Sequence, residues 1–350
     1  MFTELTKLTY HGYQQGKTYF SLAHKFLGTQ VKNYIYPNLN KSQPISQQAI
    51  ANLQERLNRL LESDWQDAQQ GVYPYDLLFD NSWLDFCLYY PAMCVDMIQV
   101  WERANRQQYQ DFSQPQEEKI YPRYYLQNFH NQTDGYLSDL SANLYDLQVE
   151  ILFNGTGDGM RRRILSPLKH QLKKFSPLKH VRILDVGCGT GRTLKLLRGA
   201  IPEASLFGVD LSPNYLRKAN QLLAENYTEL PQLIQANAEE LPYLDNYFHG
   251  VTSVFLFHEL PAAVRQTVIE QCFRVIKPGG VFIICDSIQT SDSPDLVDII
   301  NNFPRTFHEP YYINYSLDDL VARLEKAGFE HVETQVHFLS KYIIACKPVR

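Results

Sequence analysis

The segment Val181–Arg192 constrains the fold more than any other part of the chain. A short apolar run ends in Asp185, and glycine follows at every second position, at Gly187, Gly189 and Gly191. Glycine has no Cβ, so it lets the backbone turn sharply and approach a ligand closely. The pattern predicts a parallel strand that turns through a nucleotide-binding bend into a helix.

The residue that follows the last glycine distinguishes a dinucleotide-binding bend from other nucleotide-binding bends. The dinucleotide fingerprint Gly-x-Gly-x-x-Gly/Ala needs a small residue for close helix–strand packing, and this chain has Arg192 there. The form found here, Gly-x-Gly-x-Gly opened by Asp185, resembles motif I of the class I S-adenosylmethionine-dependent methyltransferases.

Further segments resemble the later motifs of that family in order and spacing: Leu206–Asp210, Leu233–Pro242, Gly250–Leu260, and Arg274–Gly280 with Val281–Asp286. Two positions depart from the family pattern. Asn237 stands where Asp is more frequent, and Phe248-His249 stands where Phe-Asp is usual before the fourth strand. The resemblance covers residues 176–350 and is closest to the small-molecule branch, which includes the ubiquinone and menaquinone methyltransferases.

The resemblance implies S-adenosylmethionine as the cofactor and a set of contacts for it. Backbone groups at the three glycines border the methionine end, and Asp185 helps to hold the ammonium group through water. Asp210 follows the glycines by about 20 residues, as a ribose-binding carboxylate should. Other residues are predicted to meet the adenine or complete the cofactor site: Leu211, Asn237, Ala238 and Phe255.

Strands and helices alternate after residue 175, which predicts an α/β fold with a Rossmann-like sheet covered on both faces. We expect seven strands, mostly parallel. Very few residues separate the last two, Glu330–Phe338 and Lys341–Cys346, so these must form a hairpin. An antiparallel last strand is also what the methyltransferase resemblance implies.

Residues 1–175 are predicted to form a mainly helical accessory or lid domain, and residues 176–350 the cofactor-binding domain. Leucines at helical spacing follow Ile50, and Gly71 can end that helix. Pro91 fits the first turn of a new helix, which predicts two helices, Ser82–Tyr90 and Pro91–Gln108. One further helix is expected over Met160–Lys173, with three arginines on a solvated face: Arg161, Arg162 and Arg163. The alternative for these arginines is a clamp for an anionic substrate.

Composition excludes several classes. The net charge is −5, so the chain lacks the basic footprint of a general nucleic-acid binder. None of its six cysteines forms a Cys-x-x-Cys pair, which disfavours a zinc or redox site, and no metal is expected. We expect no signal peptide and no membrane span, and therefore a cytoplasmic protein in a reducing compartment.

The acceptor side is predicted from polar residues that follow strands or lie in loops. His258 and Glu259 come directly after the fourth strand, where open α/β sheets bind ligands, and are the catalytic candidates. Asp286 ends the fifth strand. Other candidate substrate contacts lie in a polar loop proposed as part of a lid, or after the fifth strand: His130, Asp134 and Tyr136, and His308 and Tyr311.

Together these features predict an enzyme that transfers the methyl group of S-adenosylmethionine to a small-molecule acceptor. In-line displacement at a sulfonium needs mainly alignment of the reacting atoms, which can supply roughly 7–11 kcal/mol. Three alternatives stay open at this point: a non-catalytic S-adenosylmethionine-binding or partner-stabilising subunit, an aminopropyl transferase and, more distantly, a nicotinamide dehydrogenase.

Overall fold

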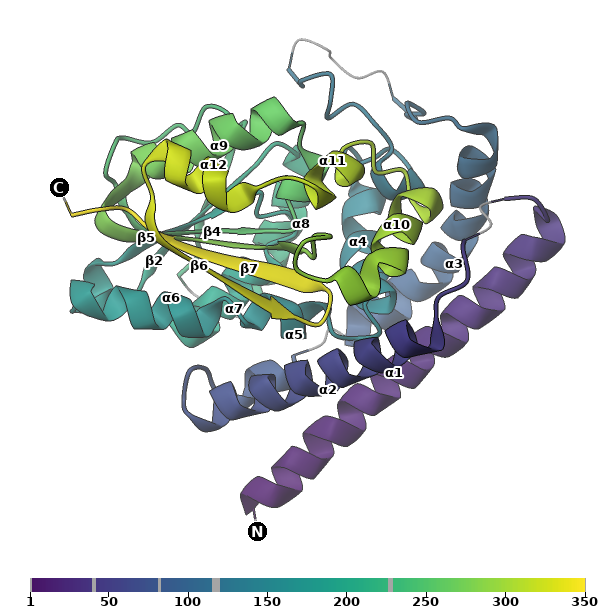
Figure 1. Cartoon of the computed structure of the whole chain (residues 1–350), viewed down its shortest axis with the longest axis horizontal. Helices are drawn as coiled ribbons and strands as arrows, with labels where there is room; N and C mark the ends of the chain where they lie inside the picture. The colour runs from purple at the N-terminus through teal and green to yellow at the C-terminus, as the bar shows by residue number, and fades with distance from the viewer. Residues whose placement is uncertain (1, 40–41, 81–82, 115–119, 226–228, 350) are drawn as a thin grey trace.

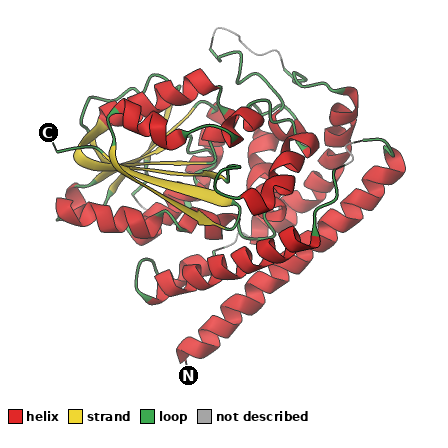
Figure 2. Ribbon diagram, in the orientation of Figure 1, coloured by secondary structure: helices red, strands yellow, loops and turns green. Residues whose placement is uncertain are grey.

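A computed structural model describes residues 2–39, 42–80, 83–114, 120–225 and 229–349. A twisted seven-stranded sheet lies between layers of helices (Figure 2). Its strands are β1 Arg182–Val186, β2 Ser205–Asp210, β3 Gln232–Gln235, β4 Phe248–Val254, β5 Ile276–Ser287, β6 Glu330–His337 and β7 Ser340–Cys346, in the order β3-β2-β1-β4-β5-β7-β6.

The predicted α/β class and sheet are confirmed. β1 to β5 run parallel, whereas β7 is antiparallel to both β5 and β6. β7 lies between β5 and β6. The short connection after His337 forces β6 and β7 into an antiparallel hairpin.

Alternate residues of each strand point to opposite faces, so two cores form. Ile183 of β1 packs with α6 Leu165–Leu172 and α7 Arg192–Ala200 on one face. Leu184 packs on the other face with α9 Ala262–Val275 and α12 Leu320–Ala327. The helices that complete the crossovers and the region after β5 are α8 Pro213–Ala224, α10 Val297–Thr306 and α11 Tyr312–Ser316.

Helices form almost all the regular structure of the N-terminal half (Figure 1). They are α1 Phe2–Ile35, α2 Gln47–Gln69, α3 Trp83–Arg106, α4 Asp139–Leu152 and α5 Gly157–Arg162. α2 ends just before Gly71, whose φ is +74°, as predicted. Residues of α2 share a buried core with α6 and one sheet face. The division into two domains at residue 175 remains a proposal.

The prediction that Pro91 begins a new helix was wrong, because α3 runs through it. Proline removes one backbone hydrogen bond. However, Phe86 and Tyr90, which precede Pro91 in the helix, both pack on Phe20 of α1. This packing holds one continuous helix.

The single helix expected over Met160–Lys173 is instead two, α5 and α6, separated at Arg163 and Ile164. Pro167 accounts for the break, since its ring would clash with the carbonyl of Arg163 in a continuous helix. Within the described residues, no helix is both long and apolar enough to cross a membrane.

Candidate active site

The glycine bend joins β1 to α7 and needs glycine at each turn. Gly187, Gly189 and Gly191 have φ values of +70°, +52° and +82°. A Cβ at Gly191 would lie 3.0 Å from Cβ of Ala219, and one at Gly187 would lie 3.1 Å from Leu256. All three have a backbone conformation that favours glycine, and at Gly187 and Gly191 a Cβ would also crowd a neighbouring side chain.

The Asp210 carboxylate faces this bend. Its Oδ2 accepts a hydrogen bond from the Gly189 amide at 2.8 Å, and its Oδ1 accepts one from the Ser212 amide at 2.8 Å. Burial raises its pKa to about 6 against the opposing effect of these two donors. At neutral pH the group is mostly ionised and can accept hydrogen bonds from a ligand.

Asp185 lies deeper, at the end of β1. Its Oδ1 accepts from the Thr252 hydroxyl at 2.7 Å, and burial raises its pKa to about 7. A cationic group bound nearby would stabilise the ionised form.

A cavity of about 100 Å³ lies over the bend. Its wall contains seven of the nine residues predicted to bind cofactor: Gly187, Gly189, Asp210, Leu211, Asn237, Ala238 and Phe255. Asp185 lies beneath the cavity, and Gly191 packs on α8 instead. Asn237 is held by Glu239, whose amide donates to Asn237 Oδ1 at 3.0 Å.

Five tyrosines line the same cavity. Tyr136 was predicted as an acceptor-side residue, and four were not predicted: Tyr124, Tyr125, Tyr145 and Tyr215. Tyr136 packs edge-on against Tyr215 and Tyr145, at centroid distances of 5.3 and 6.1 Å. The high tyrosine content of the sequence was visible, but residues so far apart in the chain gave no sign of a common cluster.

A second, mostly apolar cavity of about 70 Å³ adjoins the first and shares Tyr145, Phe255 and Glu259 with it. Apolar side chains form most of its wall: Val149, Leu152, Phe153, Ile288, Ile299, Ile300, Phe303 and Leu339. Phe255 stands between the two cavities in a strained conformation, with φ +58°, stacked on Phe153 at 5.6 Å.

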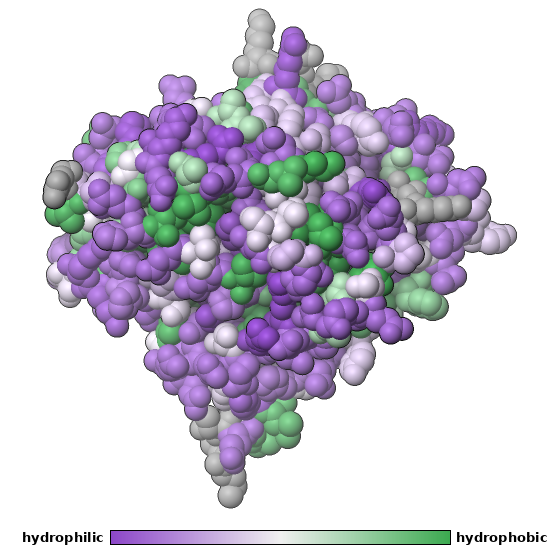
Figure 3. All heavy atoms as spheres, viewed as in Figure 1, coloured by the Kyte–Doolittle hydropathy of each residue, from purple (hydrophilic) through white to green (hydrophobic). Residues whose placement is uncertain are grey.

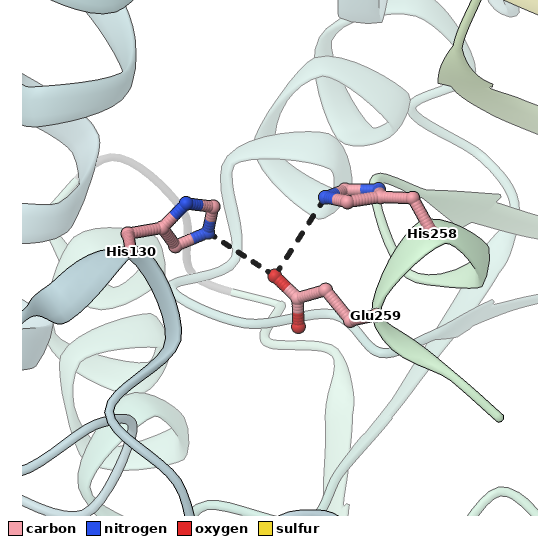
Figure 4. A group of neighbouring side chains, drawn as sticks. All are labelled: His130, His258 and Glu259. Atoms are coloured by element: carbon pink, nitrogen blue, oxygen red, sulfur yellow. Dashed lines mark hydrogen bonds and ion pairs between the residues drawn. The ribbon is translucent and has the colours of Figure 1, made fainter. Parts of the chain in front are cut away.

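His130, Glu259 and His258 line this second cavity, and Figure 4 shows the two imidazoles on either side of the Glu259 carboxylate. Acidic residues extend this charged chain beyond each imidazole. His258 Nδ1 lies 2.6 Å from Asp286 Oδ1, and His258 Nε2 lies 3.8 Å from Glu259 Oε1. On the other side of Glu259, His130 Nε2 lies 3.3 Å from the same oxygen, and His130 Nδ1 lies 2.7 Å from Glu309 Oε1. Two imidazoles thus flank one carboxylate.

Both imidazoles favour the protonated form. Burial lowers the pKa of His258, but the Asp286 carboxylate and its hydrogen bond outweigh this and raise the pKa to about 9. For His130, burial is likewise outweighed by Glu309 and Glu259, which raise the pKa to about 10. His130, His258 and Glu259 have ligand atoms within 4.8 Å of one another, a spacing that could hold a metal ion. Protonation of the imidazoles opposes that use.

Known proteins resemble this chain in the part that forms the bend. A family model described as a methyltransferase domain matches residues 183–280. The demethylmenaquinone methyltransferase of Anoxybacillus flavithermus is 32% identical over 190 residues, which cover 48% of this chain and 77% of that protein. The chain belongs to the class I S-adenosylmethionine-dependent methyltransferases.

This chain covers a smaller share of the length of other relatives. The chain spans about half, 54%, of the demethylmenaquinone methyltransferase of Geobacillus stearothermophilus, at 33% identity and with 37% of this chain aligned. It spans 38% of the arsenite methyltransferase of Halobacterium salinarum, at 32% identity and with 43% of this chain aligned. A solved structure, a putative S-adenosyl-L-methionine-dependent methyltransferase from Methanococcus maripaludis, aligns over 61% of this chain and 94% of its own, at 18% identity and a TM-score of 0.46.

The bend of this methyltransferase fits S-adenosylmethionine, the cofactor of the family. The glycine cradle admits a close ligand, and the buried Asp210 carboxylate is directed at it. Asp210 offers acceptors for ribose hydroxyls, and Asp185 a carboxyl for the ammonium. These individual assignments remain proposals.

The predicted acceptor-side residues divide into two groups. His130 and Tyr136 reach Glu259, the latter through a hydrogen bond from its hydroxyl. Asp134 instead accepts from the Ser113 amide at 2.6 Å. His308 stacks on Tyr109 and contacts Gln127 at 2.8 Å, and Tyr311 also contacts Gln127. These last residues secure the loop that carries His130.

Asp286 lies beneath His258 rather than on the cavity wall. It accepts hydrogen bonds from the Phe257 and Ser287 amides, both at 2.7 Å, in addition to its contact with His258. In the structure Asp286 therefore contacts His258 and two backbone amides. Its predicted direct contact with substrate remains a proposal.

The prediction that three arginines of the α5 region are solvated was wrong. Arg161 and Arg162 are 5% and 2% exposed, and they pair with Asp158 and Asp64 respectively. Arg163 pairs with Asp67. Their acidic partners come from distant segments or an adjacent turn, which the local charge pattern did not reveal. Arg161 also stacks over the Phe255 ring, at 5.7 Å, close to the cofactor cavity.

Proposed function

We propose that this chain transfers the methyl group of S-adenosylmethionine to a small, largely apolar acceptor that carries an ionisable nucleophile. The observation that carries the proposal is the common wall of the two cavities, formed by Tyr145, Phe255 and Glu259. One cavity contains the glycine bend and the other the charged chain. A reaction between two molecules requires such adjoining sites.

When bound, S-adenosylmethionine supplies an electrophilic methyl group. The chain's own contribution is to align the acceptor, exclude water and manage a proton. The apolar wall from Val149 to Leu339 holds the body of the acceptor and excludes water. Tyr136 and the loop around it cover the bend as a lid.

His258 is the proposed general base. Asp286 holds Nδ1–H, so Nε2 is directed to Glu259 and the cavity. In its neutral form, Nε2 takes the proton from the acceptor's nucleophile, and Asp286 stabilises the imidazolium that results. Glu259 between the two imidazoles orients their rings and offers an acceptor for a polar group of the substrate.

The test is a search for product. The full chain is incubated with methyl-labelled S-adenosylmethionine and fractionated small-molecule extracts, and products are followed by mass spectrometry. We expect one or a few low-molecular-weight labelled products that disappear with Asp210→Ala. Tight cofactor binding without any labelled product would favour the non-catalytic subunit instead.

A cytoplasmic location is part of the same proposal. All six cysteines are unpaired thiols, as expected in a reducing compartment. Cell fractionation of the native chain tests it, and recovery outside the cytoplasm would contradict it.

A further inference from the structure

Helix α1 binds its own chain through one face only. Tyr10, Gln14 and Ser21 on that face are buried. Tyr10 donates a hydrogen bond to Asp64 at 2.6 Å, and Lys17 pairs with Glu150 at 2.8 Å. The helix runs along the outside of the molecule, and its N-terminal end projects beyond the other helices (Figure 1).

The opposite face is apolar and exposed. Leu5, Leu8, Tyr19, Leu22 and Phe26 are between 47% and 70% exposed. These residues follow a spacing of three and four, and exposed Gly12, Gln15 and Thr29 occupy the remaining positions of the same repeat. We call these eight residues the seam. A seven-residue repeat of this kind is typical of a helix that packs lengthwise against another helix.

The seam carries no charge. The basic residues Lys7, Lys17 and Lys25 lie on the inner side, where they contact Glu62, Glu150 and Asn154. In a twofold-symmetric dimer, the same surface meets itself, so an uncharged surface avoids like-charge repulsion. Helices that lie on membranes instead direct cations towards anionic lipid, and these three lysines are directed away from the seam.

The exposed apolar area is large enough for a stable interface. Five of the seam's eight residues are large and apolar: Leu5, Leu8, Tyr19, Leu22 and Phe26. At roughly 100 Å² each they present about 500 Å² of apolar surface, and a standard interface buries about 800 Å² per partner, of which roughly 60% is apolar. Figure 3 shows apolar atoms at the projecting end of the molecule. A contiguous apolar patch of several hundred Å² is a typical mark of an interaction site.

We propose that the seam is a homodimer interface, occupied by the seam of a second copy of this chain. Burial of the two seams against each other removes apolar surface from water on both copies. This inference does not depend on the proposed methyl transfer.

Light scattering after size exclusion and sedimentation velocity test the proposal on the full chain. We expect a mass of twice 40.7 kDa for the wild type at micromolar concentration. The double variant Leu8→Glu/Leu22→Glu places like charges in the interface and should give the monomer mass. Leu317→Glu, at an exposed leucine outside the seam, is the matched control and should remain dimeric.

Circular dichroism establishes whether each variant is folded. The double variant Leu8→Gln/Leu22→Gln adds no charge. Its dimer should dissociate more readily on dilution than that of the wild type. A monomeric wild type across this range overturns the proposal, as does a folded double-glutamate variant that keeps the dimer mass. A wild type that is monomeric but floats with phosphatidylcholine/phosphatidylglycerol vesicles would assign the seam to a membrane surface instead.

Discussion

The proposed cofactor cavity and the proposed acceptor cavity adjoin each other but are built in different ways. The first is formed largely by consecutive motifs, because its glycines and Asp210 come from β1, β2 and the turns that follow them. The second brings together His130, His258, Asp286 and Glu309 from four separate segments. Backbone conformation specifies the first cavity, whereas tertiary packing assembles the second.

This difference has a functional consequence. A bend that depends on glycine conformation changes little among enzymes with one cofactor, while a wall of side chains from many segments can be altered for different acceptors. Variants on the two sides should therefore separate cofactor affinity from turnover.

The largest expected effect is on the acceptor side. His258→Asn keeps a donor towards Asp286 but removes the base, so kcat should fall by about 10²–10⁴-fold. The dissociation constant for S-adenosylmethionine, measured by calorimetry, should stay within about twofold because backbone and Asp210 contacts are intact. His331→Asn, at an exposed histidine, serves as the control. Full turnover in the variant would remove His258 from the mechanism.

Asp210→Ala should act on the cofactor side. Loss of a charged acceptor should weaken S-adenosylmethionine binding by roughly 10- to 100-fold. Asp245→Ala, at an aspartate exposed on the surface, should leave affinity unchanged. The ribose assignment is wrong if the Asp210 variant binds as tightly as the wild type in the same titration.

The pH dependence of turnover should follow His258. Because its pKa is raised to about 9, the neutral base is scarce at pH 7, and kcat/KM should rise about tenfold per pH unit until about pH 9. Asp286→Asn removes the charge that raises this pKa and should move the break to lower pH. A profile that is flat from pH 6 to pH 9 would show that no such base limits the reaction.

The smallest expected effect comes from loss of a hydrogen bond to Glu259, the carboxylate that lines both cavities. Tyr136→Phe keeps the ring over the cofactor cavity but loses the hydrogen bond to Glu259, so kcat/KM should fall by about fivefold with unchanged cofactor affinity. Tyr34→Phe, at a tyrosine that is 90% exposed, is the control. A loss of cofactor affinity equal to the loss of turnover would place Tyr136 entirely on the cofactor side.

Much of the fold could be predicted from local patterns. The apolar run before Asp185, the glycines after it and the short connection near Phe338 each specify a conformation that few alternatives satisfy. Prediction failed where packing overrode a local signal. α3 continues through Pro91, and Arg161 and Arg162 are buried because Asp158 and Asp64 neutralise them.

By itself, the sequence determined the glycine bend, the antiparallel hairpin at the end of the sheet, and the acids Asp185 and Asp210 at the ends of the first two strands. These depend on residues close together in the chain. Only the tertiary structure decided that Asp286 holds His258, that His130 shares Glu259 with it, and that one face of α1 is left in water. The physical reason is that hydrogen bonds and burial between distant segments depend on how the elements pack, which no local spacing records.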